Sequence, residues 1–325
     1  MNYPRASALL RVACAVALGT LSGTAGAQTF PNKPIRIFQG FAVGGTPDLI
    51  SRAFSPVMSQ VLGQPIVIEN RIGASGTAAA NAVAKAEPDG HTILCAEHGS
   101  TVYMHLLMSL PYDPIKELAI IHPSFKGEFI LVSWSGAKIN SLKDLLAEAK
   151  ANPGKLNYGH SGNGTVHHLA MELFKQRAGI DLTPVAYKGG GQSIQAVVAG
   201  QVPLVISGQN TTDPHIDSGR LKPIATFARE RWKTRPEMPT MNELFPGLEA
   251  AGWGSFFAPA GTPRDVMLKL NAAVNKALAD PETLKRLRAM GLEPPAMTLE
   301  QSHQFWMQER DLYHPLVKKL NLKLD

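Results

Sequence analysis

The sequence predicts an α/β fold made of two lobes with mostly parallel sheets. Short apolar segments alternate with amphipathic helical segments along most of the chain, and this alternation is typical of strands that are covered by helices on both faces. The 325 residues are enough for two domains of typical size. After residue 258 the pattern changes to almost continuous helix, which indicates that the last third serves a different structural purpose.

The first 27 residues have the pattern of a cleavable export signal. Arg5 and Arg11 are the only charged residues, VACAVALGTL is a short apolar stretch, and AGA ends at Ala27. The stretch is shorter than the roughly 20 residues that a bilayer-spanning helix needs. We therefore expect cleavage before Gln28. This lowers the net charge from +6 to +4, since two arginines and no acids are lost, and leaves Cys95 without an internal disulfide partner.

The remaining chain divides into strand and helix candidates. Helices are predicted at 48–63, 263–279, 281–290 and 299–320, and another follows the cap Ser141 and stops at 152–154. The strand candidates are short apolar segments bounded by turn residues, and they are Ile35–Phe38, Pro65–Glu69, Thr92–Ala96, Phe129–Trp134, Leu156–Tyr158, Leu182–Tyr187, Pro203–Ile206, Pro223–Thr226 and Trp253–Ala258.

The order of these elements predicts where the chain passes between the lobes. We expect it to cross near 128–134 and to return near 250–257. Lobe 1 would then contain residues 28–130 and 250–325, and lobe 2 residues 131–249. The protein is expected to be a monomer.

Glycine-rich loops follow several of the strands, at the sheet edge where ligands bind in open α/β folds. Gly44 and Gly45 precede Thr46, a predicted N-cap, and Asp48 lies in the first turn of the next helix. The free N–H groups of such a turn form an anion site.

The segment 158–174 repeats this arrangement in the other predicted lobe, with a loop from Ser161 to Gly164 before the cap Thr165. Weaker copies begin at Gly73 and Tyr187. If the lobes face each other, two helix N-termini would hold the two ends of one anion.

Other classes of site lack their motifs. There is no G-x-S-x-G elbow, no phosphate-binding loop, no H-E-x-x-H pair and no run of basic residues. We therefore assign no catalytic residue, metal, cofactor or nucleic-acid partner. Two alternatives to a transport receptor stay open, namely an exported α/β enzyme acting on a small organic acid and a ligand sensor for a membrane signalling protein.

The chain as a whole resembles the extracytoplasmic solute receptors of the tripartite tricarboxylate transporter system, the Bug or TctC family. The motifs that carry the resemblance occur in order and include FPNKPIRI, GGTPD, IVIENRIGASG, AVAKAEPDGHTIL, GHSGNGTVHHLAMELF, PVAYKGGGQ and WGSFFAPAGTP. The resemblance implies a type II periplasmic-binding-protein fold, two lobes joined by a hinge. It also implies a periplasmic, non-catalytic receptor that delivers a small carboxylate to a two-subunit membrane permease.

Positions that match the family's loops give the expected ligand-binding residues. They are Gly44, Gly45, Thr46, Asp48, Ser161, Gly162, Asn163, Gly164, Thr165, His168, Tyr187, Lys188 and Gly189. Phe41, His98 and Gln209 are added as candidates for the pocket wall. Val43, His160 and His167 depart from the family pattern, as does the segment CAEHGSTVYMHLL. The extra imidazoles and aromatic side chains suit an aromatic acid or a longer dicarboxylate, so the choice between aliphatic and aromatic ligands stays open.

Overall fold

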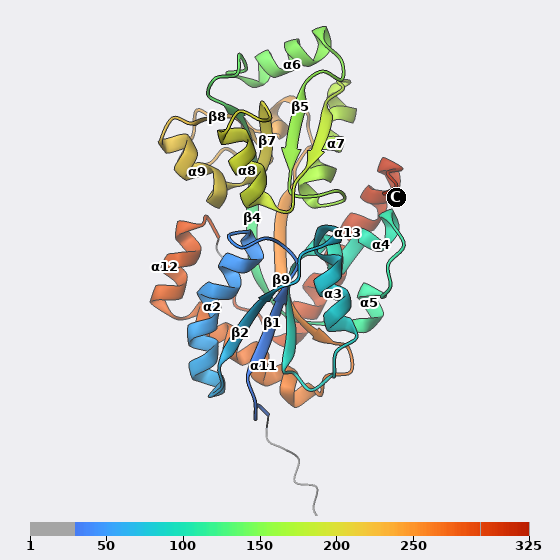
Figure 1. The fold of residues 1–325 in the computed structure, drawn as a ribbon, viewed down its shortest axis with the longest axis vertical. Helices are drawn as coiled ribbons and strands as arrows, with labels where there is room; N and C mark the ends of the chain where they lie inside the picture. Colours follow the sequence, from blue (N-terminus) through green and yellow to red (C-terminus); the bar gives the residue numbers. More distant parts are fainter. Residues whose placement is uncertain (1–29, 293, 325) are drawn as a thin grey trace, which may run out of the picture.

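The structure is a computed structural model that describes residues 30–292 and 294–324. The predicted export signal lies outside these residues. Two lobes are stacked along the long axis of the molecule, and strands β4 (Leu118–Trp134) and β9 (Ala251–Pro259) run between them (Figure 1). None of the described helices is long and apolar enough to span a membrane.

Lobe 1 contains a sheet in the order β2-β1-β3-β9-β4, with helices on both faces. Side chains of β1 alternate between two cores: Ile35 and Ile37 pack with α2 and α11, whereas Phe38 packs with α3 and α13. The elements of this lobe are β1 (Ile35–Gln39), α2 (Thr46–Leu62), β2 (Ile66–Asn70), η1 (Ala74–Gly76), α3 (Thr77–Ala84), β3 (Thr92–Glu97), η2 (Gly99–Tyr103), α4 (Met104–Leu107), α5 (Pro114–Glu117), α11 (Arg264–Leu278), α12 (Pro281–Ala289) and α13 (Leu299–Leu320).

Lobe 2 contains the end of β4, which pairs with β7 and β8, and the order continues through β5 to β6. Val205 packs with α8 on one face of this sheet, while Leu204 and Ile206 pack with α6 and α7 on the other. The elements are α6 (Leu142–Ala151), β5 (Asn157–His160), α7 (Val166–Ala178), β6 (Thr183–Ala186), α8 (Gly190–Val198), β7 (Leu204–Gly208), α9 (Gln209–Asp217), β8 (Leu221–Thr226) and α10 (Met241–Leu244).

The long strand β4 belongs to both sheets. Glu128 is its last residue paired with β9 in lobe 1, and Phe129 is the first paired with β7 in lobe 2. The expected crossing at 128–134 therefore begins at this peptide bond. The sequence predicted only the part of β4 in lobe 2, because two register shifts near Ile120 and Pro123 interrupt the alternation of apolar residues in the other part.

The sheets are mixed, and this corrects the expectation of mostly parallel pairing. Among the described strands, every antiparallel pair includes β4 or β9, and the other pairs are parallel. The reason is the crossing itself, since β4 leaves lobe 1 and β9 returns to it in the opposite direction.

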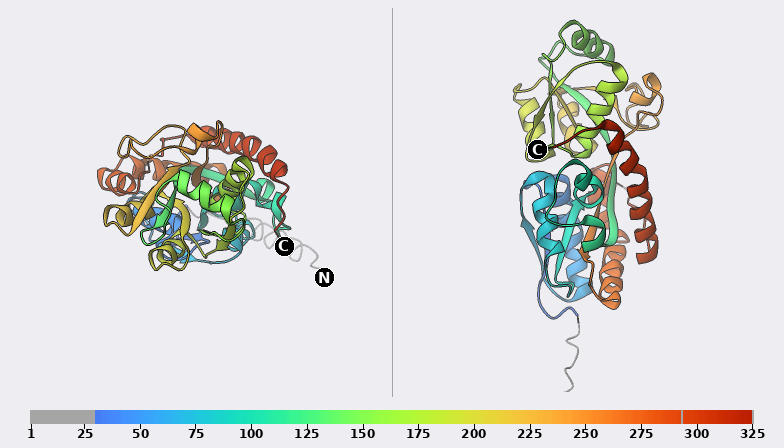
Figure 2. Two further views of the ribbon diagram at one scale, coloured as in Figure 1. Left: turned by 90° about the horizontal axis from the view of Figure 1, so that it is seen from above. Right: turned by 90° about the vertical axis from the view of Figure 1, so that its right-hand side faces the viewer.

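Most other predictions about the elements agree with the structure. Each strand candidate overlaps one observed strand, and the three predicted C-terminal helices correspond to α11, α12 and α13. The helix α2 continues through Pro56, whose exposed ring points to solvent and therefore does not disturb the core. In Figure 2, α13 lies along lobe 1 and leads the C-terminus to the boundary with lobe 2.

Gly40, directly after β1, touches the backbone of Gly76. A Cβ at Gly40 would lie 2.3 Å from the Gly76 Cα atom, and backbone atoms cannot rotate away. We expect Gly40→Ala to lower the free energy of unfolding by about 3 kcal/mol in urea denaturation. The control Gly63→Ala, at φ +69 with open space around it, should lower it by about 1 kcal/mol; equal losses would contradict the close approach.

Candidate functional site

The two lobes touch along the cleft between them. The Ala42 N–H donates to the Lys188 carbonyl oxygen at 3.3 Å, and the Ser75 hydroxyl donates to the Asn163 carbonyl oxygen at 2.7 Å. Because Ala42 and Ser75 lie in lobe 1 and their partners in lobe 2, the structure represents a closed arrangement.

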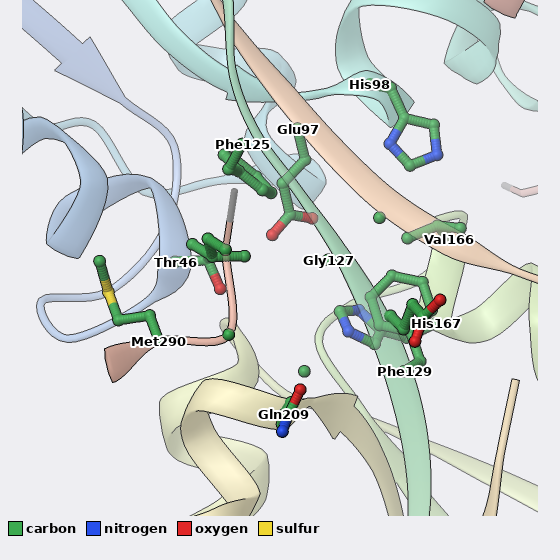
Figure 3. A pocket seen from close by; sticks show the side chains of 15 residues that line it. Thr46, Glu97, His98, Phe125, Gly127, Phe129, Val166, His167, Gln209 and Met290 are labelled. Carbon is green, nitrogen blue, oxygen red and sulfur yellow. The ribbon is translucent and has the colours of Figure 1, made fainter. Parts of the chain in front are cut away.

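Two pockets that contain expected site residues are lined by both lobes. The inner pocket has a cavity volume of about 20 Å³, little more than one ordered water molecule requires, and the outer pocket has about 590 Å³. The inner pocket is bordered by Thr46, Glu97, His98, Phe129, His167 and Gln209 (Figure 3). The outer pocket is bordered by Phe41, Ser75, Ser161, Asn163, Tyr187 and Lys188.

Three helices begin at the inner pocket. Thr46, Val166 and Gln209 line it and are the first residues of α2, α7 and α9, respectively. The first N–H groups of an α-helix have no acceptor within the helix and carry the positive end of its dipole. One helix comes from lobe 1 and two from lobe 2, so donors from both lobes meet at this pocket.

These helices also lack side-chain caps. Their N-cap residues are Gly45, Thr165 and Gly208, and none of them accepts a hydrogen bond from the first turn. Among the helices that do not begin at the inner pocket, α5, α6, α10, α12 and α13 are each capped by a side chain, whereas α3, α4, α8 and α11 are not. The missing caps leave N–H groups open to a ligand.

The first glycine loop is held by Asp48. This carboxylate is buried, accepts the Gly44 N–H at 3.1 Å and forms an ion pair with Arg52 at 3.0 Å. Asp48 therefore braces the loop and is already paired with a cation. The predicted N-cap was wrong by one residue, because Gly45 occupies that position and Thr46 begins the helix.

The second loop is held by hydroxyl groups and a histidine. The Thr165 hydroxyl donates to the Gly162 carbonyl oxygen at 2.7 Å, and the Ser161 hydroxyl donates to Thr165 Oγ1 at 3.2 Å. The Gly164 N–H donates to His168 Nδ1 at 3.1 Å. Thr165 is the N-cap residue, as predicted, but its hydroxyl stabilises the loop instead of the first turn.

Buried neutral imidazoles surround this region. Burial lowers the pKa of His98 to about 4 and the pKa values of His160 and His167 to about 3. Mutual repulsion lowers the pKa of His160 further, through His168, and that of His167 through His98. At neutral pH these rings add no positive charge to the cleft.

The hydrogen bonds of two imidazoles identify their free atoms. His98 Nδ1 lies 3.0 Å from the Trp253 carbonyl oxygen, which can only accept, and 3.5 Å from the Trp253 backbone nitrogen. The shorter contact favours a proton on Nδ1 that is donated to the carbonyl oxygen. Ser161 Oγ lies 2.6 Å from His167 Nδ1 and 3.2 Å from Thr165 Oγ1, so Nδ1 of His167 is occupied by a hydrogen bond to Ser161. In His98 Nε2 is then an acceptor, and the Nε2 atoms of His98 and His167 are both buried without a partner.

Glu97 ends β3 at the wall of the inner pocket, with a partly exposed side chain. Among the described residues, nothing donates a hydrogen bond to this carboxylate or forms an ion pair with it. Burial raises its pKa to about 7. The sequence singled out His167 and the segment CAEHGSTVYMHLL, which contains Glu97, as departures from the family pattern. It did not place Glu97 or His167 among the ligand-binding residues, although a charged residue directly after a buried strand was a usable signal.

The expected site residues divide among three places. Thr46, His98 and Gln209 line the inner pocket. Phe41, Ser161, Gly162, Asn163, Tyr187 and Lys188 line the outer pocket. Gly44, Gly45, Asp48, Gly164, Thr165, His168 and Gly189 line neither pocket.

No group of three or more His, Cys, Asp or Glu side chains could hold a metal ion within the residues that the structure describes. Glu97, His98 and His167 line one pocket but do not form such a group.

Comparisons with known proteins identify the family. A family model described as the tripartite tricarboxylate transporter family receptor, TctC, matches residues 50–322. A UPF0065 protein of Bordetella pertussis is 34% identical over 319 residues, which cover 97% of this chain and 98% of that protein.

Two solved structures from Rhodopseudomonas palustris are similar throughout. Rpa4515 with adipate is 29% identical, with a TM-score of 0.85 over 90% of this chain and 99% of that one. MatC (Rpa3494) with bound malate is 31% identical, with a TM-score of 0.84 over 89% of this chain and 100% of that one. The predicted periplasmic-binding-protein fold is thus confirmed, and the chain belongs to the TctC family of tripartite tricarboxylate transporter receptors.

Proposed function

We propose that this protein is a periplasmic receptor that captures a small mono- or dicarboxylate between its lobes and delivers it to a two-subunit membrane permease. The observation that carries the proposal is the convergence of three uncapped helix N-termini, from both lobes, on the inner pocket. The acids named for the two solved relatives, adipate and malate, belong to the same chemical class.

The ligand is held by main-chain N–H groups of α2, α7 and α9. The Thr46 and Gln209 side chains line the same pocket. Neutral donors at helix ends bind a carboxylate without a buried counter-charge, and the donors of one lobe move away when the lobes separate. Such a site can release its ligand to a permease more readily than a buried ion pair could.

Binding is coupled to lobe movement. With the lobes in contact, the inner pocket has a cavity volume of only about 20 Å³, and the Ala42–Lys188 and Ser75–Asn163 contacts join the lobes. An acid therefore enters an open form, and the lobes then close around it. The closed form, in which both lobes present one continuous surface, is the form that the permease recognises.

Isothermal titration calorimetry with malate, succinate and adipate tests the proposal. We expect saturable binding of one acid per chain, with the acid recovered unchanged. Gln209→Pro removes the first N–H of α9, and Gly208 is already extended, as a residue before proline must be. Because a charge-assisted hydrogen bond is lost, affinity should fall about tenfold or more.

The matched control is Leu299→Pro, at the first position of α13, which also follows an extended residue and does not line the inner pocket. It should leave affinity unchanged, and Gln209→Ala separates the contribution of the side chain. Absence of binding by every acid, or conversion of an acid into a product, would contradict the proposed function.

A further inference from the structure

We propose that the inner pocket selects small acids that also carry an ammonium group, with Glu97 as the counter-charge and the imidazoles of His98 and His167 as further hydrogen-bond acceptors. This inference rests on the proposed function, because it assumes that the carboxylate of the ligand lies at the helix N-termini. It narrows the ligand from carboxylic acids in general to small amino acids.

The inner pocket holds more hydrogen-bond acceptors than a simple carboxylic acid can use. The Nε2 atoms of His98 and His167 are buried and without a partner, and Glu97 has no donor among the described residues. His98 is fully buried and His167 is 6% exposed. A ligand whose polar groups are all carboxylates offers only further acceptors and cannot hydrogen-bond to these atoms. An ammonium group offers three donors.

A carboxylate side chain and a helix N-terminus lie at different places in the inner pocket. In Figure 3, Glu97 and His98 lie at one end of the inner pocket and Gln209, at the start of α9, lies at the other. Glu97 can face a cation, and the start of α9 can face an anion, while the first residues of α2 and α7, Thr46 and Val166, are drawn on the same side as Glu97 and His98. The other pocket carboxylate, Glu128, accepts a hydrogen bond from the Trp232 indole N–H, so Glu97 is the one without a donor among the residues that the structure describes.

Binding of a dicarboxylate in the inner pocket would carry an electrostatic cost. Binding a dicarboxylate beside Glu97 places like charges in a small pocket unless Glu97 takes up a proton. Its pKa of about 7 permits that uptake, but the buried Nε2 atoms would still lack donors. A bound ammonium group keeps Glu97 ionised and satisfies the acceptors at the same time.

Pairs of acids that differ only by an ammonium group test this inference. We would measure succinate against aspartate and propionate against alanine by calorimetry at pH 8, where Glu97 is ionised. The wild-type chain should bind the amino acid of each pair at least tenfold more tightly. Glu97→Gln should weaken binding of the amino acid at least tenfold and strengthen binding of its partner, so that the preference disappears.

Glu87→Gln is the matched control, because Glu87 is an exposed carboxylate of the same lobe that lines neither pocket. It should keep the wild-type preference. A wild-type preference for succinate and propionate that Glu97→Gln leaves unchanged would overturn the inference and keep the proposed function. Failure of all four acids, and of malate and adipate, would overturn both.

Discussion

Replacing Gly162 by valine is expected to weaken binding of the proposed acid about 100-fold, because the lobes can no longer close. A Cβ at Gly162 would lie 2.7 Å from Ser75 Oγ of the opposite lobe, at φ +136. Ser75 Oγ is fixed by its hydrogen bond to the Asn163 carbonyl oxygen. Overpacking of about 3 kcal/mol in the closed state corresponds to this loss of affinity, which calorimetry measures directly.

Two further variants separate closure from damage to the loop. Gly179→Val places the same residue at another left-handed glycine of lobe 2, with no atom within 4 Å of the new Cβ, and should leave affinity unchanged. Adding Ser75→Gly to Gly162→Val removes the opposing hydroxyl and should restore at least tenfold of the lost affinity. Unaltered binding by Gly162→Val would show that this contact between the lobes is not part of the bound state.

The free energy of unfolding is expected to fall by about 4 kcal/mol between pH 6.5 and pH 5. The pKa values of His98, His160 and His167 are about 3 to 4 in the folded chain, against about 6.5 when unfolded. Below pH 6.5 the unfolded state therefore binds more protons than the folded state, and the free energy of unfolding decreases as the pH is lowered. Each ring contributes a loss of about 2 kcal/mol over this interval.

Glu97 acts in the opposite direction. Its pKa is about 7 in the folded chain, above the value of about 4.3 for an unfolded glutamate, so acid favours its folded state and offsets about 2 kcal/mol. Urea denaturation at several pH values measures the net slope. His98→Phe, which can retain the stacking on Trp253, should reduce the slope of the free energy of unfolding against pH by the contribution of one buried histidine. His303→Gln, at an exposed position, should not change this slope. Constant stability over this interval would contradict the buried neutral histidines.

Most of the architecture was predictable because it depends on local patterns. The alternation of apolar strands and amphipathic helices placed nine strand candidates correctly, and paired glycines marked the loops that open on the cleft. The start of β4 was not predictable, since the bulges near Ile120 and Pro123 remove the two-residue period by which strands are recognised.

The candidate site was predictable only in part. The sequence by itself determined that helices begin after glycine-rich loops, because backbone freedom and missing caps are properties of neighbouring residues. Only the tertiary structure decided that Glu97, His98 and His167 line the same pocket as the starts of α2 and α9. These residues come from β3, its following loop and α7, on different lobes, and no local pattern encodes how two lobes meet. Burial of a charge or an imidazole likewise depends on the atoms packed around it. The charge states of the ionisable groups in the pocket are therefore set only by the folded structure.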